Sequence, residues 1–253
     1  MNSDLQRASM WKRISAFLFD FIMLGIVAVL CAWLLSSLLG YDRWQRQLSD
    51  GYARYGEQYG VNLRMSLSEY EALTEEENAR LEEAFDALSK DPEAVHAYQM
   101  VIQLTILTLT FAILLAYAVM EFIIPLRLGH GRTLGKRIFG LAVMQTDGVK
   151  ITAVGMFIRT FLGKYAIETM IPVLIILMLY WGSIGIVGPI VLLLILIVQA
   201  AVLIGTRTNS LIHDLLANTV AVDYASQMIF DSREDMIAYK ERMHAEAAQR
   251  QPY

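Results

Sequence analysis

The chain has 253 residues, a formal net charge of −4 and a single cysteine, and hydrophobic residues make up 56% of it. Its mean hydropathy of +0.44 is high for a water-soluble protein, and the lone Cys31 excludes an internal disulfide. Composition therefore favours an all-α polytopic membrane protein over a soluble or disulfide-rich one.

The first apolar run, residues 14–39, is long enough to cross the ~30 Å hydrocarbon layer, for which about 20 apolar residues suffice. It is too long for a removable signal peptide, whose apolar stretch has roughly 7–15 residues. Asp20 lies inside this run, and a carboxylate at the centre of a membrane helix costs about 2.5 to 3.5 kcal/mol. We therefore expect Asp20 to face protein, water or a cation.

Residues 41–98 form an acidic insert, in which residues 43–98 carry twelve acidic and six basic side chains. Three pairs of residues have the spacing of helix starts: Ser68 with Glu71, Thr74 with Glu77, and Asp91 with Pro92. Five aromatic residues are typical of a belt at a membrane surface: Tyr41, Trp44, Tyr52, Tyr55 and Tyr59. We expect a folded helical cap, and a docking surface for an extracytoplasmic partner is the alternative.

Two further apolar runs follow, at residues 100–124 and 166–204. The second of these is nearly twice the length of one span and is interrupted by WGSIGIVGP, whose glycines and proline are typical of a helix break. We expect two spans here, at about 166–180 and 188–204, with the first helix beginning near residue 158. A single kinked helix is the alternative.

The connector between the second and third spans contains a predicted β-hairpin, in which LAV and VKI flank the turn TDG. Residues 152–164 have an apolar stripe with basic residues off it, which predicts an amphipathic helix at the inner interface. After the last span we expect a helix at 210–217, a strand at 219–222 that pairs with the hairpin, and a solvated helical tail over 226–253.

Charge predicts the orientation of the chain. Arg7, Lys12 and Arg13 precede the first span against Asp4, and residues 125–165 carry seven basic side chains against Asp147 alone. Basic loops stay in the cytoplasm. We therefore expect both termini and the hairpin to be cytoplasmic, with Arg207 and His213 after the last span, and the acidic insert to be outside.

Three stretches resemble the RDD family of bacterial membrane proteins: WKRISAFLFD, then GRTLGKRIFGLAVMQTDGVKIT with a downstream IRTFL, and LIHDLLANTVAV. The resemblance implies an RDD-like transmembrane domain over residues 1–253, in a bacterial cytoplasmic membrane. The acidic insert at 41–98 lies within that domain but outside the resemblance, and we expect residues 226–253 to form a cytoplasmic tail. The arginine and two aspartates of the family's name fall on Arg13, Asp20 and Asp214. The family's activity is poorly defined, and cation–proton exchange is implied for some members.

The candidate site residues support two interpretations. Arg13 and Asp214 are both expected at the inner face, so that they form a cross-chain pair, and the three RDD residues then act as a folding clamp. Asp20, Glu121 and Glu168 lie at similar predicted depth, and intramembrane carboxylates are candidates for a path that carries Na⁺ or H⁺. Paired His and Cys residues do not occur, so neither a metal centre nor a cofactor is expected.

The sequence therefore indicates a multi-pass membrane protein of poorly defined activity, and transport of a small cation through the intramembrane carboxylates is one interpretation. The alternative is a non-enzymatic scaffold or accessory subunit that binds other proteins through the insert and the inner loops. We expect no enzyme, because no glycine-rich nucleotide fingerprint, G-x-S-x-G elbow or H-E-x-x-H helix occurs. A nucleic-acid partner is not expected, whereas a homo-oligomer or a protein partner remains open.

Overall fold

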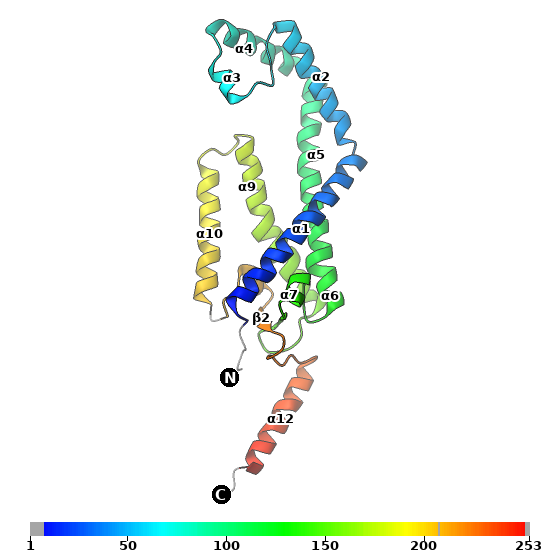
Figure 1. Ribbon diagram of the computed structural model, residues 1–253, viewed down its shortest axis with the longest axis vertical. Helices are drawn as coiled ribbons and strands as arrows, with labels where there is room; N and C mark the ends of the chain where they lie inside the picture. The colour runs from blue at the N-terminus through cyan, green and yellow to red at the C-terminus, as the bar shows by residue number, and fades with distance from the viewer. Residues whose placement is uncertain (1–7, 207, 251–253) are drawn as a thin grey trace. The chain divides into compact units, whose positions relative to one another are not determined.

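The fold is seen in a computed structural model (Figure 1), which describes residues 8–206 and 208–250. The chain forms two compact units, Met1–Ala28 with Ile113–Tyr253, and Val29–Ala112. Helices make up most of both units, as the sequence predicts. The charges at Asp4, Arg7 and Arg207, which enter the orientation argument, lie outside the described residues.

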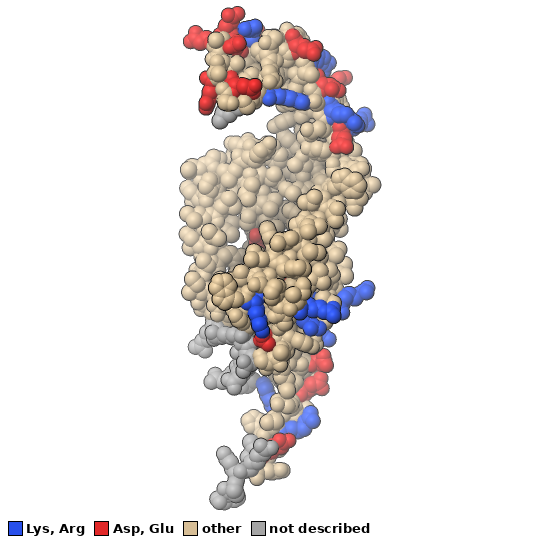
Figure 2. All heavy atoms as spheres, viewed as in Figure 1, with Lys and Arg blue, Asp and Glu red and all other residues tan. Residues whose placement is uncertain are grey.

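Within the described residues, four helices are long and apolar enough to cross a membrane: Met10–Leu38, which is α1, Pro92–Leu128, Ala153–Tyr180 and Val187–Gly205. The prediction of four spans is confirmed. The single kinked helix is wrong, because α9 (Ile171–Tyr180) and α10 (Val187–Gly205) are separate helices. Their apolar side chains give the tan surface over this part of Figure 2, which suits acyl chains rather than water.

Two of the spans contain π-helix. The second span comprises α5 (Pro92–Tyr117), η1 (Ala118–Ile123) and α6 (Ile124–Leu128). The third comprises α8 (Ala153–Phe157), the π-helix η2 (Ile158–Met170) and α9. The predicted interfacial helix over residues 152–164 is therefore wrong as a separate element, because the helix that starts at Ala153 continues without a break through the span.

The unit Val29–Ala112 contains the acidic insert, with the helices α2 (Tyr41–Tyr59), α3 (Leu67–Glu71) and α4 (Glu75–Lys90). Helix α4 lies against α2 and buries the stripe Leu81, Ala84 and Leu88. Asp91 caps α5, since one carboxylate oxygen accepts the Glu93 N–H at 2.9 Å, and the other accepts from Arg54 of α2 at 3.1 Å. The insert is folded, and its outward side chains are largely charged (Figure 2).

One predicted capping box is confirmed and the other is displaced. Thr74 and Glu77 form the box at the start of α4, with the Thr74 N–H 2.9 Å from the Glu77 carboxylate. At α3 the box is Ser66 with Glu69, not Ser68 with Glu71. Both pairs have the same spacing, but α3 begins at Leu67, so Ser66 is the residue in the capping position. The aromatic belt of α2 stays a prediction.

In the other unit, β1 (Leu141–Gln145) and β2 (Thr219–Asp223) form an antiparallel pair in which Val143 lies opposite Ala221. The strand predicted at 219–222 and its pairing are confirmed. Four side chains from the two strands form a small buried core: Ala142, Met144, Val220 and Val222. The other helices of this unit are α7 (Leu134–Ile138), α11 (Ile212–Leu216) and α12 (Arg233–Arg250), of which the last two match the helices expected near 210–217 and in the tail.

The predicted hairpin is formed only at its turn. The Gly148 N–H donates to the Gln145 carbonyl at 3.0 Å, and Gly148 has a φ of 95° that favours glycine. Beyond the turn, Lys150 forms an isolated bridge with Met144, and its N–H donates to the Phe230 carbonyl at 2.8 Å. The second hairpin strand is therefore shortened to this antiparallel bridge, because the Lys150 N–H pairs with the segment that precedes α12 instead of extending the ladder with β1.

Candidate functional site

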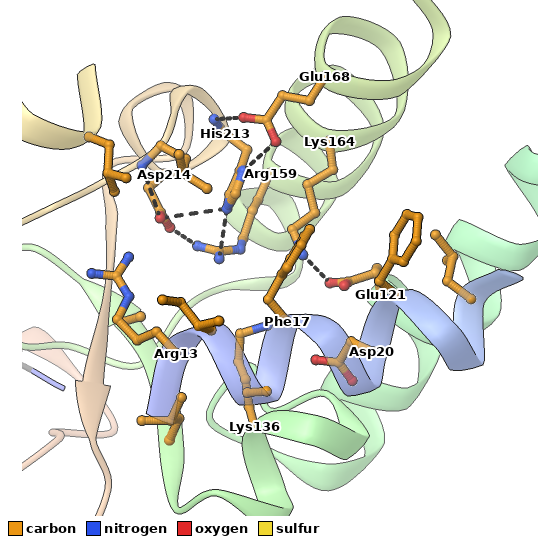
Figure 3. A pocket seen from close by; sticks show the side chains of 18 of the residues that line it. Arg13, Phe17, Asp20, Glu121, Lys136, Arg159, Lys164, Glu168, His213 and Asp214 are labelled. Carbon is orange, nitrogen blue, oxygen red and sulfur yellow. Dashed lines mark hydrogen bonds and ion pairs between the residues drawn. The ribbon is translucent and has the colours of Figure 1, made fainter. Parts of the chain in front are cut away.

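A cavity of about 320 Å³ lies in the unit formed by Met1–Ala28 and Ile113–Tyr253. Its acidic lining residues are Asp20, Glu121, Glu168 and Asp214. Its basic ones are Arg13, Lys136, Arg159, Lys164 and His213, and Figure 3 shows all nine around one space. The structure therefore brings together all five site residues that the sequence singled out.

Asp20 is received by the start of a short helix. Its side chain is buried, its Oδ1 accepts the Gly135 N–H at 2.7 Å, and its Oδ2 accepts the hydroxyl of Thr133. Thr133 is also the N-cap of α7, where its Oγ1 accepts the Lys136 N–H at 3.2 Å. Because two donors replace the lost water, the carboxylate is tolerated inside an apolar helix, as the sequence predicts.

The contact between Asp20 and Gly135 depends on close approach of the α1 and α7 backbones. A Cβ at Gly135 would lie 2.4 Å from the carbonyl oxygen of Ala16 and 2.9 Å from Cγ of Asp20. Ala16 and Asp20 are the two buried residues of α1. The small residues Ala16 and Gly135 therefore let α1 come near enough to α7 for Asp20 to reach its donors.

Asp214 forms the most deeply buried ion pair of the site, and its partner is Arg159. The two side chains are 2% and 4% exposed, and the same guanidinium nitrogen donates to Thr219 Oγ1 at 2.8 Å. Burial alone would raise the pKa of Asp214, but Arg159, then His213 and Arg13, hold that pKa well below its usual range. Asp214 is therefore ionised at neutral pH.

The predicted pair of Arg13 with Asp214 is wrong as a direct contact. Arg13 Nη1 donates to the Thr208 carbonyl at 3.3 Å. Arg159 reaches Asp214 first, because η2, which carries Arg159, packs directly against α11, which carries Asp214. Arg13 acts on Asp214 from a distance, through its charge.

His213 links the Arg159 pair to Glu168. Its Nε2 lies 3.1 Å from Arg159 Nη2, its Nδ1 lies 2.7 Å from Glu168 Oε2, and its backbone N–H donates to Glu168 Oε1 at 3.0 Å. A guanidinium has donors and no acceptor, so Nε2 must accept and the proton lies on Nδ1. Burial lowers the pKa of His213, which fits this neutral tautomer.

The remaining charges lie on the other side of the cavity. Glu121 pairs with Lys164 at 2.6 Å, and both side chains are largely buried. Lys136 Nζ lies 3.3 Å from Thr133 Oγ1. Over residues 8–206 and 208–250, no cluster of three or more His, Cys, Asp or Glu side chains has the arrangement of a metal site.

Comparison with protein families decides the relationship. A model described as the RDD family matches residues 7–218, a range that contains every charged residue of the cavity. The chain belongs to the RDD family. No curated protein and no solved structure matches it.

The three residues that the resemblance assigns to the RDD name all line the cavity, and each has its own partner. Asp20 binds α7, Asp214 binds Arg159, and Arg13 binds the Thr208 carbonyl. Together they tie the first span to the segments that follow the second and fourth spans. That these contacts act as a folding clamp stays a prediction.

From the sequence, Arg159, Lys164, Lys136 and His213 are expected only as charges that set the orientation of the chain, and their place around the cavity was not predicted. Arg159, Lys164 and Glu168 follow one another at spacings of five and four residues. In an α-helix, with 3.6 residues per turn, Lys164 and Glu168 share a face, but Arg159 points about 140° away from Lys164. In a π-helix, whose hydrogen bonds run from i to i+5, spacings of four and five keep them on one face, and η2 is such a helix.

Gly163 lies where η2 comes close to α11. Replacement of Gly163 by alanine is expected to destabilise the protein by about 1–3 kcal/mol. A Cβ there would lie 2.5 Å from His213 Cβ and 2.6 Å from His213 Cα. The measurement is the thermal melting temperature in detergent. Gly25→Ala is the control, because Gly25 has open space around it in α1, and there alanine should stabilise by roughly 0.5–1 kcal/mol. Equal melting shifts for the two variants would contradict the contact.

Proposed function

We propose that this RDD protein is a non-enzymatic transporter of a bacterial cytoplasmic membrane, which moves protons together with a small charged solute through the cavity. The observation that carries the proposal is that nine acidic and basic side chains line one cavity in a chain with four apolar helices. Ionisable groups in membrane helices are costly, and they mark ion and proton paths by default. Both π-helices carry such groups, and π-helix is frequent at functional sites.

His213 is the proton-bearing member of this proposal. In its neutral form, Nε2 accepts from Arg159 while Nδ1 donates to Glu168. A proton on Nε2 removes that acceptor and places two cations in contact, so the hydrogen bond between His213 and Arg159 breaks. Proton binding therefore changes the contacts between α11 and η2, which is the kind of two-state change that transport needs.

A Na⁺ ion must compete with protein donors for every carboxylate of the cavity. Asp20 is held by Thr133 and Gly135, and Asp214 is held by Arg159. Glu121 is the one of the four whose only ion-pair partner within the described residues is a flexible ammonium, that of Lys164, and an ammonium is more easily displaced than a guanidinium. In the Na⁺/H⁺ form of the proposal, the cation takes the place of that ammonium.

Flux in proteoliposomes tests the proposal. Purified protein, reconstituted with a pH-sensitive dye inside the vesicles, is expected to move protons when a Na⁺ gradient is applied, and Glu121→Gln and Glu168→Gln should reduce this flux to that of empty vesicles. Asp147→Asn is the control, because Asp147 pairs with Arg233 outside the cavity and should leave flux unchanged. Wild-type flux equal to that of empty vesicles, under Na⁺ and under other imposed ion gradients, would contradict transport.

The second candidate function is a scaffold that binds other proteins. The observation that favours it is the exposed acidic face of α4, which carries Glu75, Glu76, Glu82 and Glu83. This candidate predicts that charge reversal at Glu82 and Glu83 removes a co-purifying partner and that vesicle flux is absent. Transport predicts that the same reversal leaves flux intact.

A further inference from the structure

Two unpaired arginines lie on the surface of the unit that contains the cavity. Arg127 is in α6 and Arg137 is in α7, and both side chains are exposed. Within the described part of the chain, neither guanidinium takes part in an ion pair or a hydrogen bond. Three other basic side chains at the surface of this unit, Lys12, Lys150 and Arg233, each pair with an aspartate. Arg127 and Arg137 therefore carry positive charges that no acidic side chain of this part neutralises.

Each of the two arginines has an exposed apolar neighbour in the chain. Leu126 precedes Arg127 and is 40% exposed, and Ile138 follows Arg137 and is 62% exposed. Figure 2 shows basic side chains gathered near α6 and α7, beside the tan surface of the spans. A basic side chain next to an exposed apolar one is typical of a surface at the boundary between acyl chains and headgroups.

The contacts of α6 and α7 place both arginines at this boundary. The Gly135 N–H of α7 donates to Asp20 at 2.7 Å, and Asp20 lies inside the first span, α1. Arg137 follows Gly135 by two residues, which is about 3 Å of helix rise, so it lies beside that apolar helix. Arg127 is in the last turn of the second span. Each arginine is therefore held where a membrane helix meets the headgroups.

We infer that the exposed face of α6 and α7 binds the headgroups of anionic phospholipids, with Leu126 and Ile138 among the acyl chains. Charge complementarity selects this occupant, because a guanidinium presents a planar fork of donors to phosphate oxygens, and lipids with a net negative charge attract basic side chains near the surface. The apolar neighbours select a lipid over a soluble phosphate, which gains nothing from them. Neither arginine lines the cavity, so the inference goes beyond the proposed function and does not depend on it.

Helix α7 connects this surface to the cavity. Its Arg137 and Ile138 are exposed, while Lys136 lines the cavity and Gly135 contacts Asp20 of α1. Lipid bound to the exposed face therefore adds contacts that hold α7 in its folded position. A ligand that binds the folded state and not the unfolded chain stabilises the folded state. Anionic lipid should therefore raise the melting temperature of the wild type more than zwitterionic lipid does.

Lipid binding to the purified full-length protein in a nonionic detergent tests the inference. Native mass spectrometry measures the lipids retained when phosphatidylglycerol and phosphatidylethanolamine of the same chain length are offered in equal amounts. The anionic phosphatidylglycerol is expected to bind more tightly. Arg127→Gln and Arg137→Gln should each weaken its binding by roughly 5-fold, and the double variant by roughly 25-fold, whereas binding of the zwitterionic phosphatidylethanolamine should change little.

Arg242→Gln is the matched control, because Arg242 is an exposed arginine of α12, outside the four apolar helices, and its loss changes the net charge equally. It should bind phosphatidylglycerol as the wild type does. All variants should melt as the wild type does without added lipid, since the substituted side chains are exposed.

Three results would overturn the inference: equal binding of the two lipids, wild-type binding in the double variant, or an equal loss in Arg242→Gln. Glycerol phosphate, which has a phosphate headgroup without acyl chains, should not displace phosphatidylglycerol. Displacement at equal concentration would overturn the part assigned to Leu126 and Ile138.

Discussion

Replacement of Asp214 by asparagine is expected to destabilise the folded protein by about 3–5 kcal/mol, because it leaves the buried guanidinium of Arg159 without its counter-ion. The Arg159 side chain is 4% exposed. Its other hydrogen-bond partners, Thr219 and His213, carry no negative charge that could replace that of Asp214. The size of the effect follows from desolvation: an unpaired charge at this depth cannot recover its hydration without opening the contact between η2 and α11.

The measurement is unfolding in mixed detergent micelles, together with the fraction of protein that elutes as a single species. Asp223→Asn is the matched control, since Asp223 pairs with Lys12, whose side chain is 48% exposed. Surface ion pairs of this kind contribute about 0–1 kcal/mol to stability. The double variant Arg159→Gln with Asp214→Asn should recover part of the loss, because it removes the unpaired charge along with its partner. A cost for Asp214→Asn equal to that for Asp223→Asn would show that the pair contributes nothing to stability.

The spans could be predicted from the sequence because their signal is local. An apolar run long enough for the bilayer identifies a membrane helix by itself, and the glycines of WGSIGIVGP separate the last two spans whatever packs around them. The same holds for the cap of α4, where Thr74 and Glu77 bond to each other across one turn. In α3, two overlapping pairs satisfied the same local rule, and the start of the helix at Leu67 decided between them.

The partners within the site could not be predicted, because they depend on contacts between distant segments. The cost of a buried carboxylate identified Asp20 as a residue that needs a partner, yet its donors lie more than 110 residues away, at Thr133 and Gly135. Arg159 was counted as an interfacial charge because the α-helical period was assumed. Under the π-helical period of η2, Arg159, Lys164 and Glu168 share a face, which turns toward α11 and η1 contacts that the local sequence does not reveal.

Lys136→Met is expected to stabilise the ligand-free protein at pH 7, by up to roughly 3 kcal/mol, and to flatten the dependence of its stability on pH. Burial, with the charge of Lys164 next, lowers the pKa of Lys136 from 10.5 to about 8. The groups that act on it are Lys164 and Arg159 of η2, which lower the pKa, and Glu121 of η1 and Asp20 of α1, which raise it. Below pH 8 the folded protein therefore carries a charge that its surroundings disfavour.

The sign of the pH dependence follows from proton binding. Between pH 8 and 10.5, folded Lys136 has lost its proton while the unfolded chain keeps it, so the unfolded state binds more protons and the free energy of unfolding rises with pH. Unfolding of the wild type and of Lys136→Met is measured from pH 7 to 10.5, and other titrating groups cancel in the difference between the two curves. Lys90→Met is the control, because Lys90 lies in the insert with a side chain that is 72% exposed, and its curve should run parallel to that of the wild type.

A Lys136→Met curve that also runs parallel to the wild type would mean that the ammonium is hydrated in the folded protein, which would contradict its burial. A curve that converges with the wild type at high pH would mean that the protein retains a destabilising cation at this position. Such a cost is typical of a group that is kept for function rather than for stability.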